Sequence, residues 1–526
     1  MQAMLELDAD SFAVKKAAID KLAHTHDPRM IPFLENFTRG SVYIWNGTVV
    51  VSNETRETAD GKLALLLDPF TLMPMMNGPD PVTCPFKQLK PVEAGRRERG
   101  LVRDAHVLLR LYNPDRDARH SAAVKCGDIG DESNLPALKE CLQQETDGKV
   151  RAALEESIEL LTLVAGDSTD DERVKAVQKL GELRATRALS VLKDMQSKNP
   201  PPALAAALKT SIAGIERWQT IARGFGYVFS GISLGTILVL MALGLSIIFG
   251  MMGVINMAHG ELMMIGAYAT FLTQKTFEYA IVRHWLPQGA FDWYFIAAIP
   301  AAFLTAALAG YLIEILIIRH LYGRPLETLL ATFGVSLILI QAVRMEFGDN
   351  IAVNSPSWLQ GGAEVMPDIV LPYNRCFIIG FCILCVLLMY FLVNRTKLGL
   401  LLRATTQNRG MAASLGIATR RIDGYTFALG AGLAGLAGCA LTQIGGVTPD
   451  MGQNYVVDSF LVVVTGGVGK LAGAIWAGFG LGCLEKIFEP FFQAIWAKVL
   501  ILALIVLFIQ KRPSGLFPAK GRLADV

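Results

Sequence analysis

The stretch YVFSGISLGTILVLMALGLSIIF, residues 227–249, holds 23 residues without a charged side chain. A helix that crosses the hydrocarbon core of a bilayer needs about 20 apolar residues, so this stretch predicts a membrane span. Similar runs recur to the end of the chain, and residues 221–526 therefore predict an all-α polytopic membrane bundle. We expect about eight spans: Tyr227–Phe249, Val254–Leu272, Phe295–Ile318, Leu326–Met345, Phe377–Val393, Ile422–Ile444, Val456–Gly480 (continuous or broken) and Phe492–Ile509.

The composition excludes several classes of protein. Of the 526 residues, 18% are charged and 52% are hydrophobic, whereas about 25% charged residues are usual in soluble domains. A simple soluble enzyme is therefore excluded. The formal net charge of +2 is too small to indicate a nucleic-acid partner. The eight cysteines are scattered over the chain and do not form the pattern of a disulfide framework.

Residues 1–220 have a different character, because charged and apolar residues alternate there at helical spacing. Three stretches share one layout: a basic, alanine-rich helix, a turn, and a second helix rich in leucine. They are Phe12–Phe37, Ala118–Leu142 and Glu172–Met195. Because such units bury their apolar faces by stacking on neighbours, we expect a soluble HEAT-like α-solenoid domain. An unrelated helical bundle is the alternative.

Residues 40–98 interrupt this helical pattern. The sequence SVYIWNGTVVVSNE, residues 41–54, has β-branched and aromatic runs on either side of Asn46-Gly47. That dipeptide favours the type I′ turn of a β-hairpin. Six prolines follow between positions 69 and 91. We therefore predict a small β-hairpin insert followed by an irregular, proline-rich excursion.

Basic residues in the loops predict the orientation of the bundle, because Lys and Arg are enriched on the cytoplasmic side. The basic residues of the longest such loop are Arg395, Lys397, Arg403, Arg409, Arg420 and Arg421. Counting back through three spans from the shorter basic loop at 319–324 places residues 1–220 outside the cytoplasm. An exported domain needs a signal peptide, yet Met1–Asp10 lacks a basic start and an apolar core. Either the sequence begins after a removed signal, which we favour, or one span is re-entrant and the domain is cytoplasmic.

The sequence contains two partial matches to enzyme or metal motifs, and neither is complete. The stretch TGGVGKLAG, Thr465–Gly473, lacks the first glycine and the Ser/Thr of a phosphate-binding loop. Cys382 and Cys385 form a C-x₂-C pair inside an apolar run, without the second pair that zinc requires. We therefore predict that the chain is not an enzyme and has no catalytic residue, metal site or cofactor of its own.

The stretch GMMGVINMAHGELMMIGAY, residues 250–268, places Asn256, His259 and Glu261 at membrane depth among several glycines. Ionisable side chains there normally face a cavity or the protein interior, and a broken helix is tolerated where it lines a path. We predict a translocation pathway segment. The alternative, which is compatible, is that the cluster caps a half-helix and fixes packing. Further polar candidates for the path are Thr332, Gln341 and Gln443.

The long basic loop, residues 396–423, is too long for a simple connector. Its apolar residues, Ala404, Ala412, Ala413, Leu415 and Ile417, fit one face of short amphipathic turns among the arginines. We predict that this face docks into a groove on a cytoplasmic protein. A loop that lies on lipid headgroups is the alternative. Downstream, the glycines of ALGAGLAGLAGCALTQIGG, residues 428–446, have the small-residue spacing of close helix packing in lipid.

Several motifs together resemble the LivH-type permeases of branched-chain amino acid ABC importers. They are GLSIIFGMMGVINMAHGELMMIGAY, GLLLRATTQNRGMAASLGI, FALGAGLAGLAG, VVTGGVGKLAGAIWAG and RPSGLF, and they extend over residues 225–517. The soluble half, with DPRMIPFLENF and PALKECLQQETDGKVRAALE, resembles the N-terminal extension of urea ABC transporter permeases of B-subunit type. This second resemblance is the more degenerate one.

The resemblance implies a bacterial inner-membrane protein that works with a second homologous permease, two ABC ATPase subunits and a periplasmic urea-binding protein. ATP and magnesium are then bound by the ATPase subunits. The resemblance also makes the basic loop the element that couples the permease to the ATPases. Its residues are Arg403, Ala404, Asn408, Gly410, Ala412, Leu415, Gly416 and Ile417.

Three functional hypotheses follow. The first is an ABC importer permease for urea or short-chain amides, since urea needs polar groups along the path and no fixed charge to pair with. The second is a permease for branched-chain amino acids that carries an accessory solenoid. The third, from another class, is a membrane-anchored scaffold whose helices transport nothing.

Overall fold

The computed structural model describes most of the chain and divides it into two compact units, residues 1–219 and 220–526. The described residues are 2–9, 11–25, 27–53, 55–58, 61–77, 80–367 and 369–517. Helix α10 (Pro202–Met252) passes through the boundary between the units. Each unit is described here by itself.

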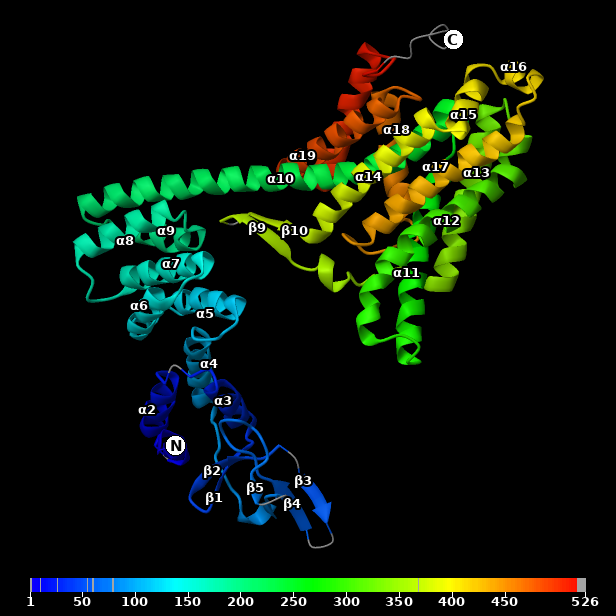
Figure 1. Ribbon diagram of the computed structural model, residues 1–526. Helices are drawn as coiled ribbons and strands as arrows, with labels where there is room; N and C mark the ends of the chain where they lie inside the picture. The colour runs from blue at the N-terminus through cyan, green and yellow to red at the C-terminus, as the bar shows by residue number, and fades with distance from the viewer. Residues whose placement is uncertain are drawn as a thin grey trace. The chain divides into compact units, whose positions relative to one another are not determined.

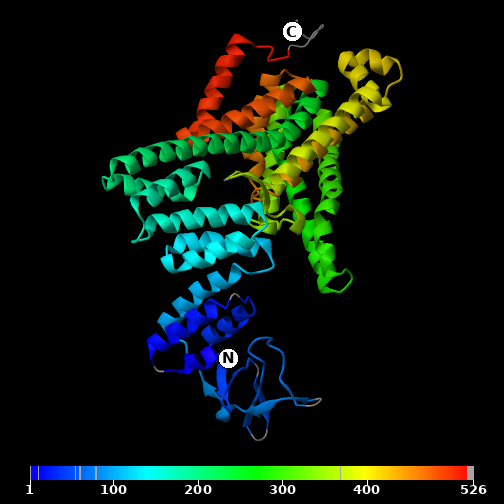
Figure 2. The ribbon, with the colours of Figure 1, turned by 60° about the vertical axis from the view of Figure 1, so that its left-hand side comes forward.

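The first unit is mainly helical and confirms the three predicted helix–turn–helix units. Its helices are α1 (Gln2–Leu5), α2 (Phe12–Ala23), α3 (Met30–Arg39), α4 (Arg96–Arg110), α5 (Arg116–Ile129), α6 (Leu135–Gln144), α7 (Gly148–Val164), α8 (Asp170–Glu182) and α9 (Leu189–Ser197). The predicted pairs are α2 with α3, α5 with α6, and α8 with α9. In Figures 1 and 2 the helices α5 to α9 lie in successive layers, as in a HEAT-like stack. Helices α4 and α7, which lie between the predicted pairs, are additional.

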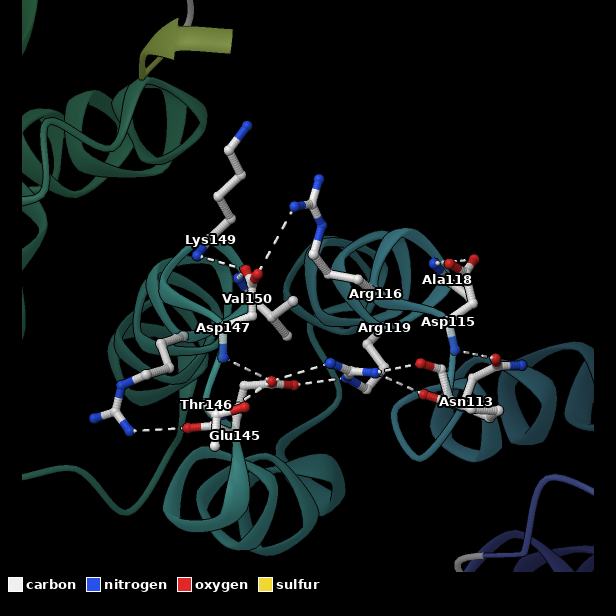
Figure 3. Close-up of polar contacts among 12 residues, drawn as sticks. Asn113, Asp115, Arg116, Ala118, Arg119, Glu145, Thr146, Asp147, Lys149 and Val150 are labelled. Carbon is white, nitrogen blue, oxygen red and sulfur yellow. Dashed lines mark hydrogen bonds and ion pairs between the residues drawn. The ribbon is translucent and has the colours of Figure 1, made fainter. Parts of the chain in front are cut away.

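Two of these helices begin with an aspartate cap, and an ion pair joins the loops that precede them. Asp115 and Asp147 cap α5 and α7 by accepting hydrogen bonds from backbone N–H groups of the first turn. Four residues after Asp115, Arg119 donates to both carboxylate oxygens of Glu145, at 2.7 and 3.1 Å, and to the carbonyl of Asn113 at 2.9 Å (Figure 3). The Glu145 side chain is only 6% exposed. This bidentate ion pair therefore ties the loop before α5 to the loop before α7.

The β-hairpin prediction is confirmed. Strands β1 (Val42–Trp45) and β2 (Thr48–Val51) pair antiparallel, and the two turn residues have the positive φ angles of a type I′ turn, 48° at Asn46 and 75° at Gly47.

The prediction that an irregular stretch follows is wrong. Short strands continue through it: β3 (Thr55–Thr58), β4 (Gly61–Leu65), β5 (Met76–Asn77), β6 (Asp80–Pro81), β7 (Thr83–Pro85) and β8 (Lys90–Pro91). They form sheets in the orders β2-β1-β8, β3-β4-β7 and β5-β6. Proline lacks an N–H donor, so it fits at the margin of a sheet. Pro81, Pro85 and Pro91 are each the last residue of their strand, and the prolines therefore end strands without preventing them.

The second unit is a bundle of apolar helices. It contains the end of α10 and α11 (His259–Val282), α12 (Tyr294–Leu316), α13 (Pro325–Phe347), α14 (Tyr373–Arg395), α15 (Lys397–Gln407), α16 (Arg409–Ser414), α17 (Thr419–Leu441), α18 (Met451–Gly466) and α19 (Leu471–Lys511). Among the described residues, six helices are long and apolar enough to cross a membrane: α10, α12 with its flanking turns, α13, α14, α17 and α19. The other two predicted spans correspond to α11 and to α18, which has only 16 residues.

Local backbone features set three span boundaries. The start predicted at Val254 is wrong, the break that the sequence left open within Val456–Gly480 is present, and the start predicted at Phe492 lies next to a bend. The span predicted from Val254 has no helix until His259. The span predicted over Val456–Gly480 is broken between α18 and α19, where Gly467 and Gly469 have φ angles of 100° and 74°, values that L side chains rarely adopt. The span predicted over Phe492–Ile509 is the second part of α19, which bends at Gln493, φ 62°.

The segment between α13 and α14 also contains an antiparallel pair that the sequence did not predict, β9 (Gly362–Met366) and β10 (Ile369–Pro372).

Close glycine contacts hold the bundle together, as predicted from the glycine spacing. A Cβ atom added to Gly438 of α17 would lie 1.9 Å from the carbonyl oxygen of Met263 in α11. Likewise, a Cβ on Gly266 would lie 2.2 Å from the oxygen of Gly435. Real Cβ atoms do not approach so closely, so α11 and α17 pack backbone against backbone. Gly445 is different, because a Cβ there would meet no atom within 4 Å.

Candidate functional site

A helix break between α10 and α11 confirms the expectation that the helix is interrupted here. α10 ends at Met252, α11 begins at His259, and Gly253 has a φ angle of 69°. The side-chain oxygen of Asn256 accepts a hydrogen bond from the N–H of Ala258 at 3.1 Å, which satisfies one backbone donor at the start of α11. Ala258 is the N-cap residue of α11 and no described side chain caps the helix, so the expected capping of a half-helix by this cluster is not observed.

The break contacts the middle of α13. The N–H of Met257 donates to Thr332 Oγ1 at 3.1 Å, and Ser336 Oγ donates to Glu261 Oε1 at 2.7 Å. Thr332 and Ser336 are four residues apart, so they lie on the same face of α13. Thr332 was among the residues predicted to line the path, but Ser336 was not, although the i, i+4 spacing of the two residues was a signal for it.

The side chains at the break are fully buried yet retain unused polar atoms. Asn256, His259 and Glu261 each have 0% exposure. His259 Nε2 lies 3.1 Å from the carbonyl oxygen of Met241. Among the residues that the structure describes, Asn256 Nδ2, His259 Nδ1 and Glu261 Oε2 have no hydrogen-bond partner. Since buried polar atoms are usually paired, these three atoms remain available as hydrogen-bonding groups at the break.

The two remaining pathway candidates lie apart from the break. Gln341 has an exposed side chain, and at nine residues after Thr332 it points to about the opposite face of α13. Gln443 is buried beyond the end of α17, where Asn374 Nδ2 donates to its backbone oxygen at 2.8 Å. The structure therefore groups Asn256, His259, Glu261 and Thr332, but neither glutamine joins them.

A second buried polar cluster lies further along α11 and was not predicted. Gln274 is 1% exposed; its Oε1 accepts from the N–H of Asn354 at 2.9 Å and its Nε2 donates to Glu278 at 2.7 Å. The hydroxyl of Tyr294 donates to the carbonyl of Asn354. At 1.5 Å per residue, Gln274 is about 20 Å from Glu261 along the helix, so the two clusters are separate.

The long basic loop contains two helices, α15 and α16. Asn408 caps α16, since its Oδ1 accepts from the N–H of Met411 at 2.9 Å, and Gly416 ends it with a φ angle of 85°. Leu415 is 76% exposed and Met411 is 60% exposed. Met411 lies in α16 and Leu415, four residues later, is its C-cap residue; together they form an apolar knob, which we call the α16 knob.

The other coupling candidates have different positions in this loop. Ala412 is 3% exposed and packs inward, so the prediction that it belongs to the outward apolar face is wrong. Arg403 and Gly410 are exposed, and Ala404 and Ile417 are half-buried. A cavity of about 920 Å³ adjoins the knob, and both Met411 and Leu415 line it, together with Ser246, Met251, Arg403 and Lys470. Met411 was not among the residues predicted to form the apolar face.

Comparisons with known proteins identify the second unit. The family described as "Branched-chain amino acid transport system / permease component" matches residues 227–509, just over half of the chain. The PBS lyase HEAT-like repeat matches residues 118–144, which form the second predicted unit of the solenoid.

Individual relatives agree with this family. The high-affinity branched-chain amino acid transport system permease protein LivH of Salmonella typhimurium is 30% identical, over 55% of this chain and 94% of the relative. BraD of Pseudomonas aeruginosa is 29% identical, over 55% and 93% of the two chains. LivM of Escherichia coli is 26% identical, over 54% and 69%. No solved structure gives a significant match.

The shared region contains the helix break, the α16 knob and the glycine-packed helices. The relatives are membrane permease subunits of ABC transporters and not enzymes. Together with the apolar helices, they indicate a multi-pass inner-membrane protein. The chain accordingly belongs to the family of permease components of branched-chain amino acid transport systems.

Proposed function

We propose that this chain is the permease subunit of an ABC importer and that the α16 knob couples it to ATPase subunits. The supporting observation is that α16 is capped at both ends and still leaves Met411 and Leu415 exposed side by side. Apolar anchors at i and i+4 on a helix suit a groove on a protein partner. The basic residues around the knob indicate the cytoplasmic side, where ATP is available.

The partners of the importer follow from this role. They are a second homologous permease, two ATPase subunits that bind ATP and magnesium, and an extracytoplasmic binding protein that delivers the solute. The permease has no cofactor in this proposal. ATP binding and hydrolysis move the docked knob, and this motion changes the packing of the helices around the path.

The helix break is the proposed solute path. Glu261 Oε2 is an unused acceptor and Asn256 Nδ2 is an unused donor, and both belong to an interrupted helix that touches the middle of α13. Irregular backbone at such depth is tolerated where it lines a cavity or is buried in protein. Weak binding suffices there, because the solute has to be released again.

The relatives favour branched-chain amino acids as the solute, because the printed names of LivH, BraD and LivM all refer to their transport. The unused atoms suit such a solute: an acceptor for the ammonium group and a donor for the carboxylate. Urea, with short-chain amides, is the second candidate. Its N–H and C=O groups suit the same two atoms. It is favoured by the N-terminal HEAT-like domain, which resembles the extension of urea permeases and lies outside the region matched to the permease family.

We also propose that residues 1–219 are periplasmic. The end of α10 lines the same cavity as the coupling loop, through Ser246 and Met251. If that loop is cytoplasmic, Met251 lies at the cytoplasmic end of α10. Residue 220 is about 45 Å from Met251 along this helix, which exceeds the roughly 30 Å thickness of the hydrocarbon core. A reporter fusion at residue 200, active only after export, tests this orientation, and activity only in the cytoplasm contradicts it.

Uptake by cells that lack the gene tests the function and distinguishes the two solutes. Loss of high-affinity uptake of labelled leucine with normal urea uptake supports the amino-acid importer, and the opposite result supports the urea importer. Complementation with the intact gene controls for effects on neighbouring genes. Normal uptake of both solutes would support the scaffold hypothesis and contradict the proposal.

A further inference from the structure

Charged side chains from three segments meet at the end of the bundle that carries α16, and the permease role does not yet account for them. Glu314, near the end of α12, has a side chain with 0% exposure. Arg319 Nη2 lies 2.9 Å from Glu314 Oε2, and the hydroxyl of Tyr322 lies 3.4 Å from Glu314 Oε1. A buried carboxylate needs partners of this kind to remain charged. The turn after α12 is thereby fixed to α12.

Arg409, the first residue of α16, connects this group to α16 and α17. Its guanidinium lies 4.6 Å from the centre of the Tyr322 ring, within the range of a cation–π interaction. It also forms an ion pair with Asp423 of α17, whose side chain is 4% exposed. Arg409 thus joins α16 to both the turn after α12 and the start of α17.

α12 and α17 are in close contact at this level. A Cβ atom added to Gly424 would lie 2.7 Å from the ring of Tyr311 and 3.3 Å from Glu314 Oε2. The rings of Tyr311 and Tyr425 stack 6.5 Å apart with planes 12° from parallel. Since closely packed helices transmit displacement as a body, a force applied to one of them at this end moves the other.

We propose that Arg409 is a positioning residue that transmits the movement of α16 to α12 and α17. The inference rests on the proposed function, because it assumes that α16 docks on an ATPase. If α16 moved without α12 and α17, the buried carboxylate of Asp423 would lose its ion-pair partner, which is unfavourable. The α16 knob faces the partner, whereas Arg409 holds α16 to the bundle. Docking and transmission are therefore carried by different residues and are separable by mutation.

The test uses the importer complex, with the second permease and both ATPases, in lipid nanodiscs and proteoliposomes. Its readout is the number of solute molecules transported per ATP hydrolysed, with labelled leucine or urea, whichever the wild type transports. We expect Arg409→Ala to retain the ATPase subunits on size-exclusion chromatography and to lower this ratio at least 10-fold. A double variant that exchanges the two charges, Arg409→Asp with Asp423→Arg, should recover at least half of the wild-type ratio of solute transported to ATP hydrolysed. A contact that merely stabilises the fold would change yield or thermal stability and leave the ratio unchanged.

The matched control is Arg420→Ala. Arg420 is exposed on the first turn of α17, and within the described part of the chain its side chain has no hydrogen bond or ion pair. We expect a wild-type ratio for this variant. If Arg409→Ala does not give a monodisperse complex, Arg409→Gln replaces it with the same expected loss, because glutamine retains a donor but lacks the charge.

Two results overturn the inference while the proposed function stands: a wild-type ratio in Arg409→Ala, or an exchange variant no better than the single variant. Loss of the ATPase subunits in Arg409→Ala also overturns it, since the residue would then belong to docking. If the wild-type complex neither retains the ATPases nor hydrolyses ATP in response to solute, the proposed function itself fails and the inference fails with it.

Discussion

Truncation of Leu415 tests whether the α16 knob binds an ATPase subunit. Complete burial of a leucine side chain contributes about 1.5–3 kcal/mol, and Leu415 is 76% exposed in the isolated subunit. Docking therefore gains up to about 2 kcal/mol from this side chain. Since 1.4 kcal/mol corresponds to a tenfold change in affinity, Leu415→Ala should weaken ATPase association about 30-fold. Leu415→Asp should abolish it, because a carboxylate would be buried without a partner.

The assay is titration of the purified ATPase subunits onto permease complexes in nanodiscs, with binding measured by fluorescence anisotropy. Leu387→Ala is the control, since Leu387 is a similarly exposed leucine, 59%, on the apolar helix α14. We expect wild-type affinity for this control. Equal affinity in the wild type, Leu415→Ala and Leu415→Asp would refute the docking role of the knob and favour a loop that lies on lipid headgroups.

Three further predictions follow from particular contacts. Arg119→Ala should lower the free energy of unfolding of the first unit by about 2 kcal/mol in chemical denaturation, because the buried carboxylate of Glu145 loses its ion-pair partner and is left with two backbone N–H donors. The hydrogen bond from Arg119 holds the pKa of Glu145 below its ordinary value. The stability from this pair is therefore complete above about pH 4.3 and is lost as the pH falls through the folded pKa. In Arg119→Ala, the free energy of unfolding should fall less steeply over this pH range. Gly438→Ala should prevent correct assembly, judged by detergent-resistant monodispersity, while Gly445→Ala should not, because only the first Cβ meets backbone. Ser336→Ala should lower uptake severalfold without lowering protein yield, since it removes the donor to the carboxylate at the helix break; unchanged uptake would contradict the proposed path.

Local patterns in the chain were sufficient for the element types and for much of the site. Apolar runs of span length predicted most membrane helices, and Asn46-Gly47 predicted its hairpin, because both signals depend on short-range chemistry. The glycines around Asn256 likewise predicted the helix break. The same local reasoning left open whether the span over Val456–Gly480 is broken and placed the start of the next helix after the first break at Val254 instead of His259, because a turn of the backbone has no apolar signature.

Contacts between distant segments were decided only by the tertiary structure. Residue types alone show that Glu261 and Ser336 are polar, but the fold brings them to 2.7 Å across 75 positions. In the same way, the sequence shows only that Arg409 is one of several arginines in a basic loop. The fold places its guanidinium over the ring of Tyr322 and in an ion pair with Asp423. The physical reason is that periodicity and turn chemistry act over a few residues, whereas the pairing of buried polar groups depends on which helix faces meet.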